Sequence, residues 1–163
     1  MFTDKYYFVH EFSSDGRYLL LADKDLLHVI SSEDGTELCS YPCDGSRAVV
    51  RSDGRFIVIA SDETIHVQDI TVDKTFMLTG HISKVKSMAI HSDVNLHVSS
   101  ASDGTVRLWN LAAMTCVNVI EYDNSASCAI LSREGDVLIS VHKSKDDQYN
   151  KVQFLKLREN RNK

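Results

Sequence analysis

Short apolar runs and small polar turns alternate along the whole chain and repeat at a regular interval. The turns open the stretches "SSDGRYLLLAD" from Ser13, "RSDGRFIVIAS" from Arg51, "HSDVNLHVSSAS" from His91 and "SREGDVLISV" from Ser132. They recur roughly every 40 residues, a period typical of architectures built by repeating one small supersecondary unit. The pattern therefore predicts four copies of one unit.

Each copy has the pattern of an antiparallel meander of short strands. A strand-like run precedes each turn, at 8–12, 46–50, 85–90 and 127–131. A run with period-two alternation follows the strand after the turn, at 26–31, 64–70, 105–111 and 151–157. A further run closes the first three copies, at 38–43, 76–80 and 116–122. No segment has a convincing helical pattern, so the sequence predicts an all-β chain.

The run "TVRLWNL" at 105–111 carries apolar residues on both of its faces. Val106 and Leu108 alternate with Trp109 and Leu111, and successive side chains of a strand point to opposite faces. Both faces of such a sheet must be covered, as they are in small sheets repeated radially in a propeller. We expect these residues of the third copy to be buried: Val85, Met88, Ile90, Leu96, Val98, Val106 and Leu108.

The composition is that of a globular protein with an acidic balance. The 163 residues are 43% hydrophobic and 25% charged, with a formal net charge of −5. This length predicts a single domain, and the acidity argues against a protein that grips nucleic acid by itself. No apolar run is long enough for a membrane span or a signal peptide, which predicts an intracellular, soluble protein without a membrane partner. The four cysteines lack metal-ligand spacing, and no metal or cofactor is expected.

Residues 80–110 carry a motif with a physical logic. Gly80 and His81 precede the first strand, Ser99 lies on the second, Asp103 lies in the next turn, and Trp109-Asn110 ends the third. A partly buried histidine needs hydrogen-bond partners, and an Asp–His–Ser–Trp chain would satisfy each polar group. The motif resembles the WD-repeat family of β-propellers. The resemblance implies that the four side chains form one structural network, made of His81, Ser99, Asp103 and Trp109.

The other copies depart from this motif. Gln68-Asp69 stands at the Trp-Asp position of the second copy, Ile30-Ser31 at that of the first, and Leu155-Lys156 at that of the fourth. The resemblance is therefore specific only for residues 80–122, although the strand pattern covers nearly the whole chain. We expect one WD-repeat domain over residues 1–163, with blades at approximately 5–43, 44–80, 81–123 and 124–158.

Four such blades are fewer than propellers of this family usually contain. The fourth copy also lacks an outer strand, for which "TDKYY" at 3–7 is a short candidate. We therefore expect an incomplete propeller: the N-terminal part of a longer protein, a reduced family member, or one half of an assembly. Its open edges are expected to favour self-association.

The resemblance implies docking of other proteins on the loops that enter each first strand and link the second strand to the third. The matching positions are Lys84, Lys86 and Ser102 in the third copy and Ser46, Arg47 and Ser61 in the second. The alternative for each is an ordinary solvated loop residue. A cluster of Lys84 and Lys86 with Arg107 would suit an acidic partner.

Two leading copies without tryptophan, followed by a "TGH" copy, also resemble the first propeller of tandem-propeller scaffold proteins of the small-subunit processome. This finer resemblance implies a nucleolar scaffold in ribosomal RNA processing, with protein partners and indirect RNA association. The alternatives are a generic WD-repeat adaptor of another intracellular complex and an RNA-binding module.

A serine, a histidine and an aspartate within one copy would also fit a hydrolytic triad. Ser99, however, lies inside a predicted strand and lacks the strained turn of a nucleophile. The seven histidines show no metal-ligand spacing such as H-E-x-x-H, and no glycine-rich phosphate loop is present. We therefore expect no enzyme, and no catalytic, cofactor-binding or metal-binding residue is assigned.

Overall fold

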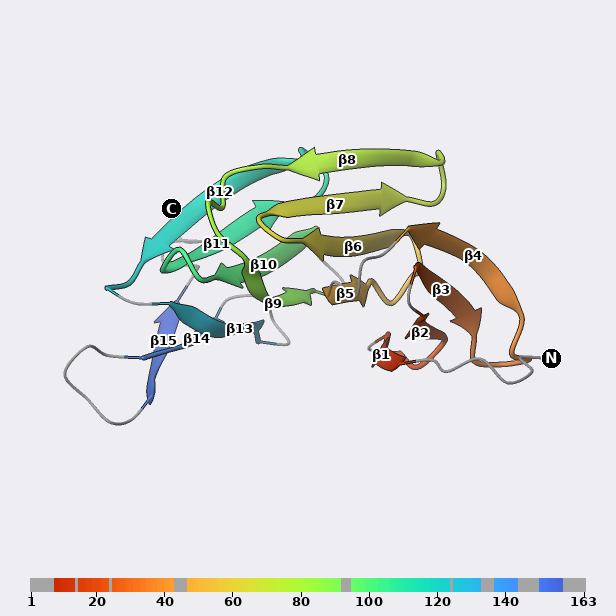
Figure 1. The fold of residues 1–163 in the computed structure, drawn as a ribbon, viewed down its shortest axis with the longest axis horizontal. Coiled ribbons are helices and arrows are strands. Elements are labelled where there is room, and N and C mark those ends of the chain that lie inside the picture. The colour runs from red at the N-terminus through yellow and green to blue at the C-terminus, as the bar shows by residue number, and fades with distance from the viewer. Residues whose placement is uncertain are drawn as a thin grey trace, which may run out of the picture. The chain divides into compact units, whose positions relative to one another are not determined.

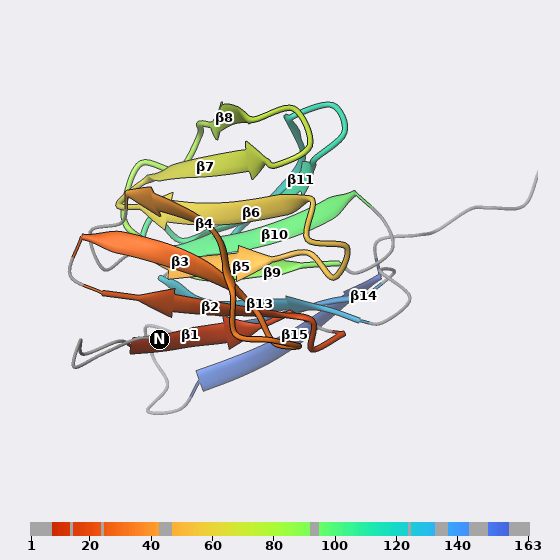
Figure 2. The same cartoon turned by 90° about the vertical axis from the view of Figure 1, so that its right-hand side faces the viewer.

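The structure, a computed structural model, describes residues 8–13, 15–23, 25–42, 47–91, 95–123, 125–132, 137–143 and 150–156. The regular secondary structure in these ranges is β-strand, arranged in four sheets whose strands follow chain order (Figure 1; Figure 2). The chain divides into two compact units. The first comprises Met1–Ser61 and Ile65–Phe76, and the second comprises Asp62–Thr64 and Met77–Lys163.

The first unit holds one complete meander and most of a second. The first sheet runs β1 (Phe8–Phe12), β2 (Tyr18–Ala22), β3 (Leu26–Ser31) and β4 (Glu37–Pro42). The second sheet runs β5 (Arg47–Val50), β6 (Phe56–Ser61), β7 (Thr64–Asp69) and β8 (Lys74–Leu78). The β6–β7 turn and the end of β8 belong to the second unit.

The second unit holds the other two sheets. The third sheet runs β9 (Val85–Ile90), β10 (Leu96–Ala101), β11 (Thr105–Asn110) and β12 (Thr115–Glu121). The fourth sheet has three strands, β13 (Ala126–Leu131), β14 (Val137–Lys143) and β15 (Asn150–Lys156). Where the connection is described, as at 102–104 between β10 and β11 and at 111–114 between β11 and β12, a short turn joins the two strands.

The predicted all-β fold of repeated meanders is confirmed. Three sheets have four strands, and the fourth has three described strands, in line with the missing apolar run in that part of the sequence. The "TDKYY" segment lies outside the described residues, so its suggested role stays a prediction. Within the described ranges, no helix is long and apolar enough to cross a membrane.

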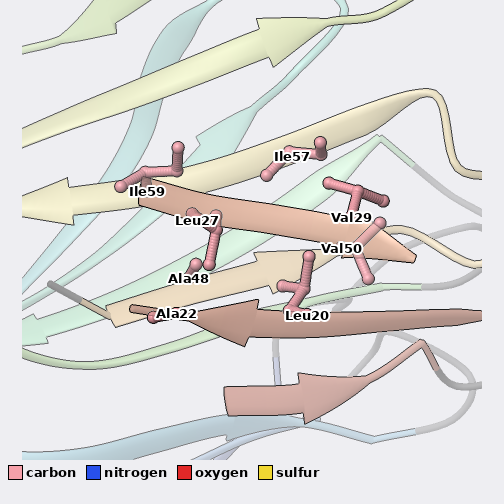
Figure 3. Close-up of a cluster of buried hydrophobic side chains, with 8 residues drawn as sticks. All are labelled: Leu20, Ala22, Leu27, Val29, Ala48, Val50, Ile57 and Ile59. Carbon is pink, nitrogen blue, oxygen red and sulfur yellow. The ribbon is translucent and has the colours of Figure 1, made fainter. Parts of the chain in front are cut away.

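An aliphatic cluster joins the two sheets of the first unit (Figure 3). Its buried members are Leu20, Ala22, Leu27, Val29, Ala48, Val50, Ile57 and Ile59. In the β2–β3 register Leu20 pairs with Val29 and Ala22 pairs with Leu27, so these four lie on one face of the first sheet. Strands β5 and β6 supply the other four. Full burial contributes roughly 1.5–3 kcal/mol for each large aliphatic side chain, so this cluster stabilises the contact between the two sheets.

In the second unit, one face of the third sheet packs against the fourth sheet. Val98, Val106 and Leu108 form a buried cluster with Ala126 and Ala129 of β13. Residues on the opposite face of β11 are buried as well, since Trp109 is only 1% exposed. Both faces of the third sheet therefore carry buried residues, as the alternation in "TVRLWNL" predicts.

Two of the residues that we expected to be buried are only half-buried. Ile90 ends β9 and Leu96 begins β10, so both lie at one end of the third sheet. A strand end has fewer neighbours to cover it than the middle of a strand, which explains the difference. The other residues of the expected set are buried: Val85, Met88, Val98, Val106 and Leu108.

Replacement of Leu27 by alanine tests the first-unit cluster. Leu27 is fully buried, so Leu27→Ala should lower the free energy of unfolding by about 2–5 kcal/mol because a cavity remains. The matched control is Leu38→Ala on β4, where the side chain is 53% exposed and the expected cost is below about 1 kcal/mol. Urea unfolding followed by circular dichroism measures both. Equal losses in the two variants would contradict the assigned core.

Candidate functional site

An unbroken hydrogen-bonded chain crosses the third sheet. His81, in the segment that leads into β9, lies between Asp103 and Ser99. Its Nδ1 is 2.9 Å from Oδ2 of Asp103, and its Nε2 is 2.8 Å from Oγ of Ser99. The indole Nε1 of Trp109 donates to Ser99 Oγ at 2.8 Å. The structure thus brings together the four residues that the sequence singled out for a network.

The hydrogen-bond partners of each residue determine where the protons lie in this network. Burial lowers the pKa of His81, although the hydrogen bond to Asp103 opposes the change, and the lowered pKa favours the neutral imidazole. With Nδ1–H donating to Asp103, Nε2 accepts the hydroxyl proton of Ser99. The Ser99 oxygen in turn accepts from Trp109. Because each polar group has a partner, the cost of burying the chain is largely offset.

Asp103 binds several groups at once. Its Oδ1 accepts from the hydroxyl and the backbone amide of Thr105, both at 2.8 Å, and its Oδ2 accepts from the amide of Ile82 at 3.0 Å. Burial raises the pKa of the carboxyl, but the hydrogen bonds from Thr105, Ile82 and His81 outweigh it and leave the pKa below its usual value. The ionised carboxylate therefore ties the segment before β9 to the β10–β11 turn. Sequence reasoning missed Thr105, although the Asp-Gly-Thr turn is a signal that could have found it.

The Asp–His–Ser geometry resembles that of a hydrolytic triad, but Ser99 cannot serve as its nucleophile. Ser99 is fully buried on β10, so no substrate can approach its hydroxyl oxygen. That oxygen is also occupied, since it accepts from Trp109 while its proton goes to His81. A nucleophile needs an accessible oxygen beside oxyanion donors. The arrangement is suited to holding segments together and not to acyl transfer.

Gly80 has a backbone conformation that favours glycine, and a side chain there would displace the end of the Arg107 side chain. Its φ is 149°, and a Cβ would lie 2.5 Å from Nη1 of Arg107. Arg107 pairs with Ser99 in the β10–β11 register, so its side chain lies on the face of the sheet that carries the network. The guanidinium charge adds to the effect of burial in lowering the pKa of His81. The Gly-His pair thus combines a close approach of the backbone with a buried imidazole.

The second sheet uses other residues at the equivalent positions. Gln68 stands where Trp109 stands in the third sheet, and its amide oxygen accepts from the hydroxyl of Thr75 on β8. The next residue, Asp69, binds the guanidinium of Arg55 at 2.8 Å. The hydrogen bond from Arg55 is the main reason why the pKa of Asp69 lies below its usual value. These contacts link neighbouring strands and the turn before β6, so they clamp this sheet with different chemistry.

A mostly exposed surface lies around the start of β9 and the β10–β11 turn, and we call it the β9 surface: Ile82, Lys84, Lys86 and Ser102. Ile82 is 86% exposed, although Asp103 holds its amide. Lys84 and Lys86 are exposed, and Ser102 is half-buried. The amide of Ser102 donates to the carbonyl of Lys84 at 2.9 Å, so the two loops are adjacent. Sequence reasoning missed Ile82, because a single apolar loop residue forms no pattern.

The charge around the β9 surface is mixed. The amide of Val85 donates to the carbonyl of Asp62 at 2.8 Å, which places the exposed Asp62-Glu63 turn beside Lys84. Arg107, which we considered as a third basic residue of this cluster, lies over Gly80 on the network face. The surface therefore offers an apolar centre with both signs of charge around it.

The candidate positions of the second copy lie in the first unit. Arg47 begins β5, is exposed, and pairs with Ala60 in the register of β6. Ser61 follows Ala60 at the end of β6 and is half-buried. Arg47 and Ser61 thus lie at the same end of the second sheet. Ser46 lies outside the described residues.

His97 is another buried histidine, and it was not singled out from the sequence. His97 pairs with Trp109 in the β10–β11 register and is fully buried. Neither of its ring nitrogens has a hydrogen-bond partner of normal geometry, although the backbone of Ala89 is near enough to favour the protonated ring. Burial dominates and lowers the pKa of His97 to about 3. A single histidine in an apolar run gives no sequence signal of this kind.

One protein family matches the part of the sequence that carries the motif. Residues 73–110 match the WD40 family, "WD domain, G-beta repeat". This range runs from β8 to β11. It includes all four residues of the hydrogen-bonded network, which are His81, Ser99, Asp103 and Trp109. The class that fold and site define together is thus a chain of WD40-type propeller blades.

Curated relatives resemble most of this chain but are much longer. Pre-mRNA-processing factor 19 of Mus musculus is 30% identical over 123 residues, which are 74% of this chain and 24% of that protein. U3 small nucleolar RNA-associated protein 21 of Saccharomyces cerevisiae is 29% identical over 93 residues, which are 56% of this chain and 10% of that protein. The chain therefore spans about a quarter or less of the length of these two relatives.

A solved structure has the same fold. "Crystal structure of RRP9 WD40 repeats" superposes with a TM-score of 0.67 at 21% identity, covering 82% of this chain and 44% of that chain. At this identity the likeness shows the fold alone. The fold is all-β and consists of WD40-type blades, as in a partial propeller. The family match and the structural neighbour support the WD40 repeat family for this chain.

Removal of the Asp103 carboxylate tests the network. Asp103→Ala leaves His81 and the Ile82 amide without their partner, so we expect a loss of about 1–3 kcal/mol in the free energy of unfolding. Asp123→Ala, at an exposed aspartate of the same unit, is the matched control and should change little. Thermal and urea unfolding measure both. An unchanged melt of Asp103→Ala would show that the network does not stabilise the unit.

The buried His97 should make the fold sensitive to acid. In the unfolded chain an imidazole titrates near pH 6.5, whereas burial lowers the pKa of His97 to about 3. Between these values the unfolded chain binds a proton that the folded chain does not, so the free energy of unfolding falls as the pH decreases. His81, whose pKa is also lowered, acts in the same direction.

His97→Leu should therefore flatten the pH dependence of stability between about pH 6.5 and pH 4. The measurement is urea unfolding of both proteins at several pH values in this window. The free energy of unfolding of His97→Leu, relative to that of the parent, should rise as the pH falls. A constant difference across the window would contradict the lowered pKa of His97.

Proposed function

We propose that the chain is a non-catalytic WD-repeat scaffold that binds other proteins within a multi-subunit complex, with the β9 surface as a contact site. The supporting observation is the double role of Asp103, which binds buried His81 and also the amide of exposed Ile82. An apolar anchor is thus presented from a rigid base, which reduces the ordering cost of binding. An apolar centre with a charged rim is the usual anatomy of a protein–protein contact.

The complex that we favour processes RNA, with the small-subunit processome as the first candidate. The "TGH" blade after two blades without tryptophan and the similarity to U3 small nucleolar RNA-associated protein 21 support it. A pre-mRNA-processing complex is the second candidate, because the alignment with pre-mRNA-processing factor 19 is longer. Either complex implies a nuclear site of action, nucleolar for the processome. The net charge of −5 favours RNA association through protein partners over direct binding.

Affinity purification of the tagged chain from its own cells tests this function. We expect the chain to recover protein subunits of one stable complex, together with its RNA. Recovery of processome subunits and U3 RNA supports the first candidate, and recovery of pre-mRNA-processing proteins supports the second. A complex unrelated to RNA would contradict both candidates and keep the scaffold role. Recovery of no partner would contradict the scaffold role itself.

The contact site is tested with variants of the β9 surface in the same purification. Ile82→Ser combined with Lys84→Glu should reduce partner recovery by about tenfold or more, because the anchor and part of the charged rim are lost. The control is Val72→Ser, which removes an exposed aliphatic side chain in the first unit. Both proteins should melt like the parent. Full recovery by the β9-surface variant would place the contact elsewhere.

A further inference from the structure

The face of the fourth sheet that points away from the second-unit core is apolar and exposed. Ile130, Val152 and Phe154 are 45%, 55% and 68% exposed. In the register, Ile130 and Phe154 belong to one row across the sheet, which passes through Ile139. Leu155, on the opposite face, packs against the core cluster. Ile130 on β13 and Val152 and Phe154 on β15 therefore lie on the same face of the fourth sheet.

The equivalent positions are buried in the other three sheets. Val152 and Phe154 lie on β15, the third strand of the fourth sheet. The equivalent positions on the third strands of the other sheets are Leu27 and Val29 on β3, Ile65 and Val67 on β7, and Val106 and Leu108 on β11. Each of those six residues is at most 6% exposed. In the first unit the second sheet covers this face, and in the second unit β13 covers it. The fourth sheet therefore presents a face of the type that receives another sheet.

The first sheet presents the complementary type of face. Phe12 of β1 pairs with Leu19 of β2, on the side opposite to the core residue Leu20. Phe12 is 53% exposed and Leu19 is half-buried. Their counterparts in the second sheet, Val50 and Ile57, also pair in register and belong to the cluster that covers the first sheet. The exposed face of β1 and β2 is therefore of the type that covers another sheet.

We propose that the exposed face of β13–β15 binds the exposed face of β1–β4 of a second copy of this chain, head to tail. The two faces are the repeat equivalents of the two sides of the contact between the first and second sheets. The association would therefore repeat a packing that the chain already makes within itself. Every copy carries both halves, so a second copy is a complete partner. Burial of apolar surface drives the contact, and Phe12 and Phe154 would contribute most of it.

A head-to-tail contact uses different surfaces on the two copies, which makes it testable by mixing two blocked variants. Phe154→Lys blocks the receiving face and leaves the covering face intact. Phe12→Lys does the reverse. Val117→Lys on β12, where the side chain is 51% exposed, is the control for placing a lysine on an exposed strand position. Circular dichroism melts establish that each variant is folded before its mass is measured by sedimentation or light scattering.

The parent chain and Val117→Lys should associate as the concentration rises. Phe154→Lys alone and Phe12→Lys alone should each lose about tenfold or more in self-association, whereas their equimolar mixture should form a one-to-one complex. A parent that stays a single chain at every concentration would overturn the proposal. Association of Phe12→Lys alone as strong as that of the parent would also overturn it, because the two receiving faces would then be binding each other. If a variant melts well below the parent, Phe154→Ser and Phe12→Ser replace the lysine pair in the same mixing test.

Discussion

The sheets of this chain have two apolar faces, and neither face is stable in water until something covers it. Strand alternation normally gives a sheet one polar face, but in β11 both Val106 and Trp109 are buried although they point to opposite sides. A single meander of this kind cannot fold alone. Its stability depends on its neighbours, as in other repeat proteins, so the sheet-to-sheet clusters are the units on which everything else rests.

Asp103 connects this packed interior with the surface. The carboxylate orders the turn before β11, holds the imidazole of His81 and fixes the amide of Ile82. Its own pKa stays low because these donors outweigh the effect of burial. One buried charge thus aligns groups on two loops. These hydrogen bonds hold a short, irregular segment in a fixed conformation, because each hydrogen bond is stronger where water is excluded.

The copies show that the position of a residue is more constant than its chemistry. Trp109, Gln68 and Ile30 occupy the same place in three sheets, and all three are buried. The indole donates to a serine, the glutamine amide bonds across to β8, and the isoleucine needs no polar partner. What the fold requires there is a side chain that excludes water and leaves no polar atom unpaired. A single motif therefore identifies only the best-preserved copy.

The sequence by itself determined the strands, their order and the motif residues. Period-two alternation and turn residues act locally, so the meanders could be predicted without coordinates, and the resemblance to WD repeats implied the grouping of His81, Ser99, Asp103 and Trp109. Two features depended on tertiary structure: the complete burial of His97, and the exposure of Ile82 and Phe154. Whether a side chain is buried or paired depends on segments far away in the chain. Val152 and Phe154 have the same alternation as Val106 and Leu108, and only the presence or absence of a covering sheet separates a core residue from an exposed one.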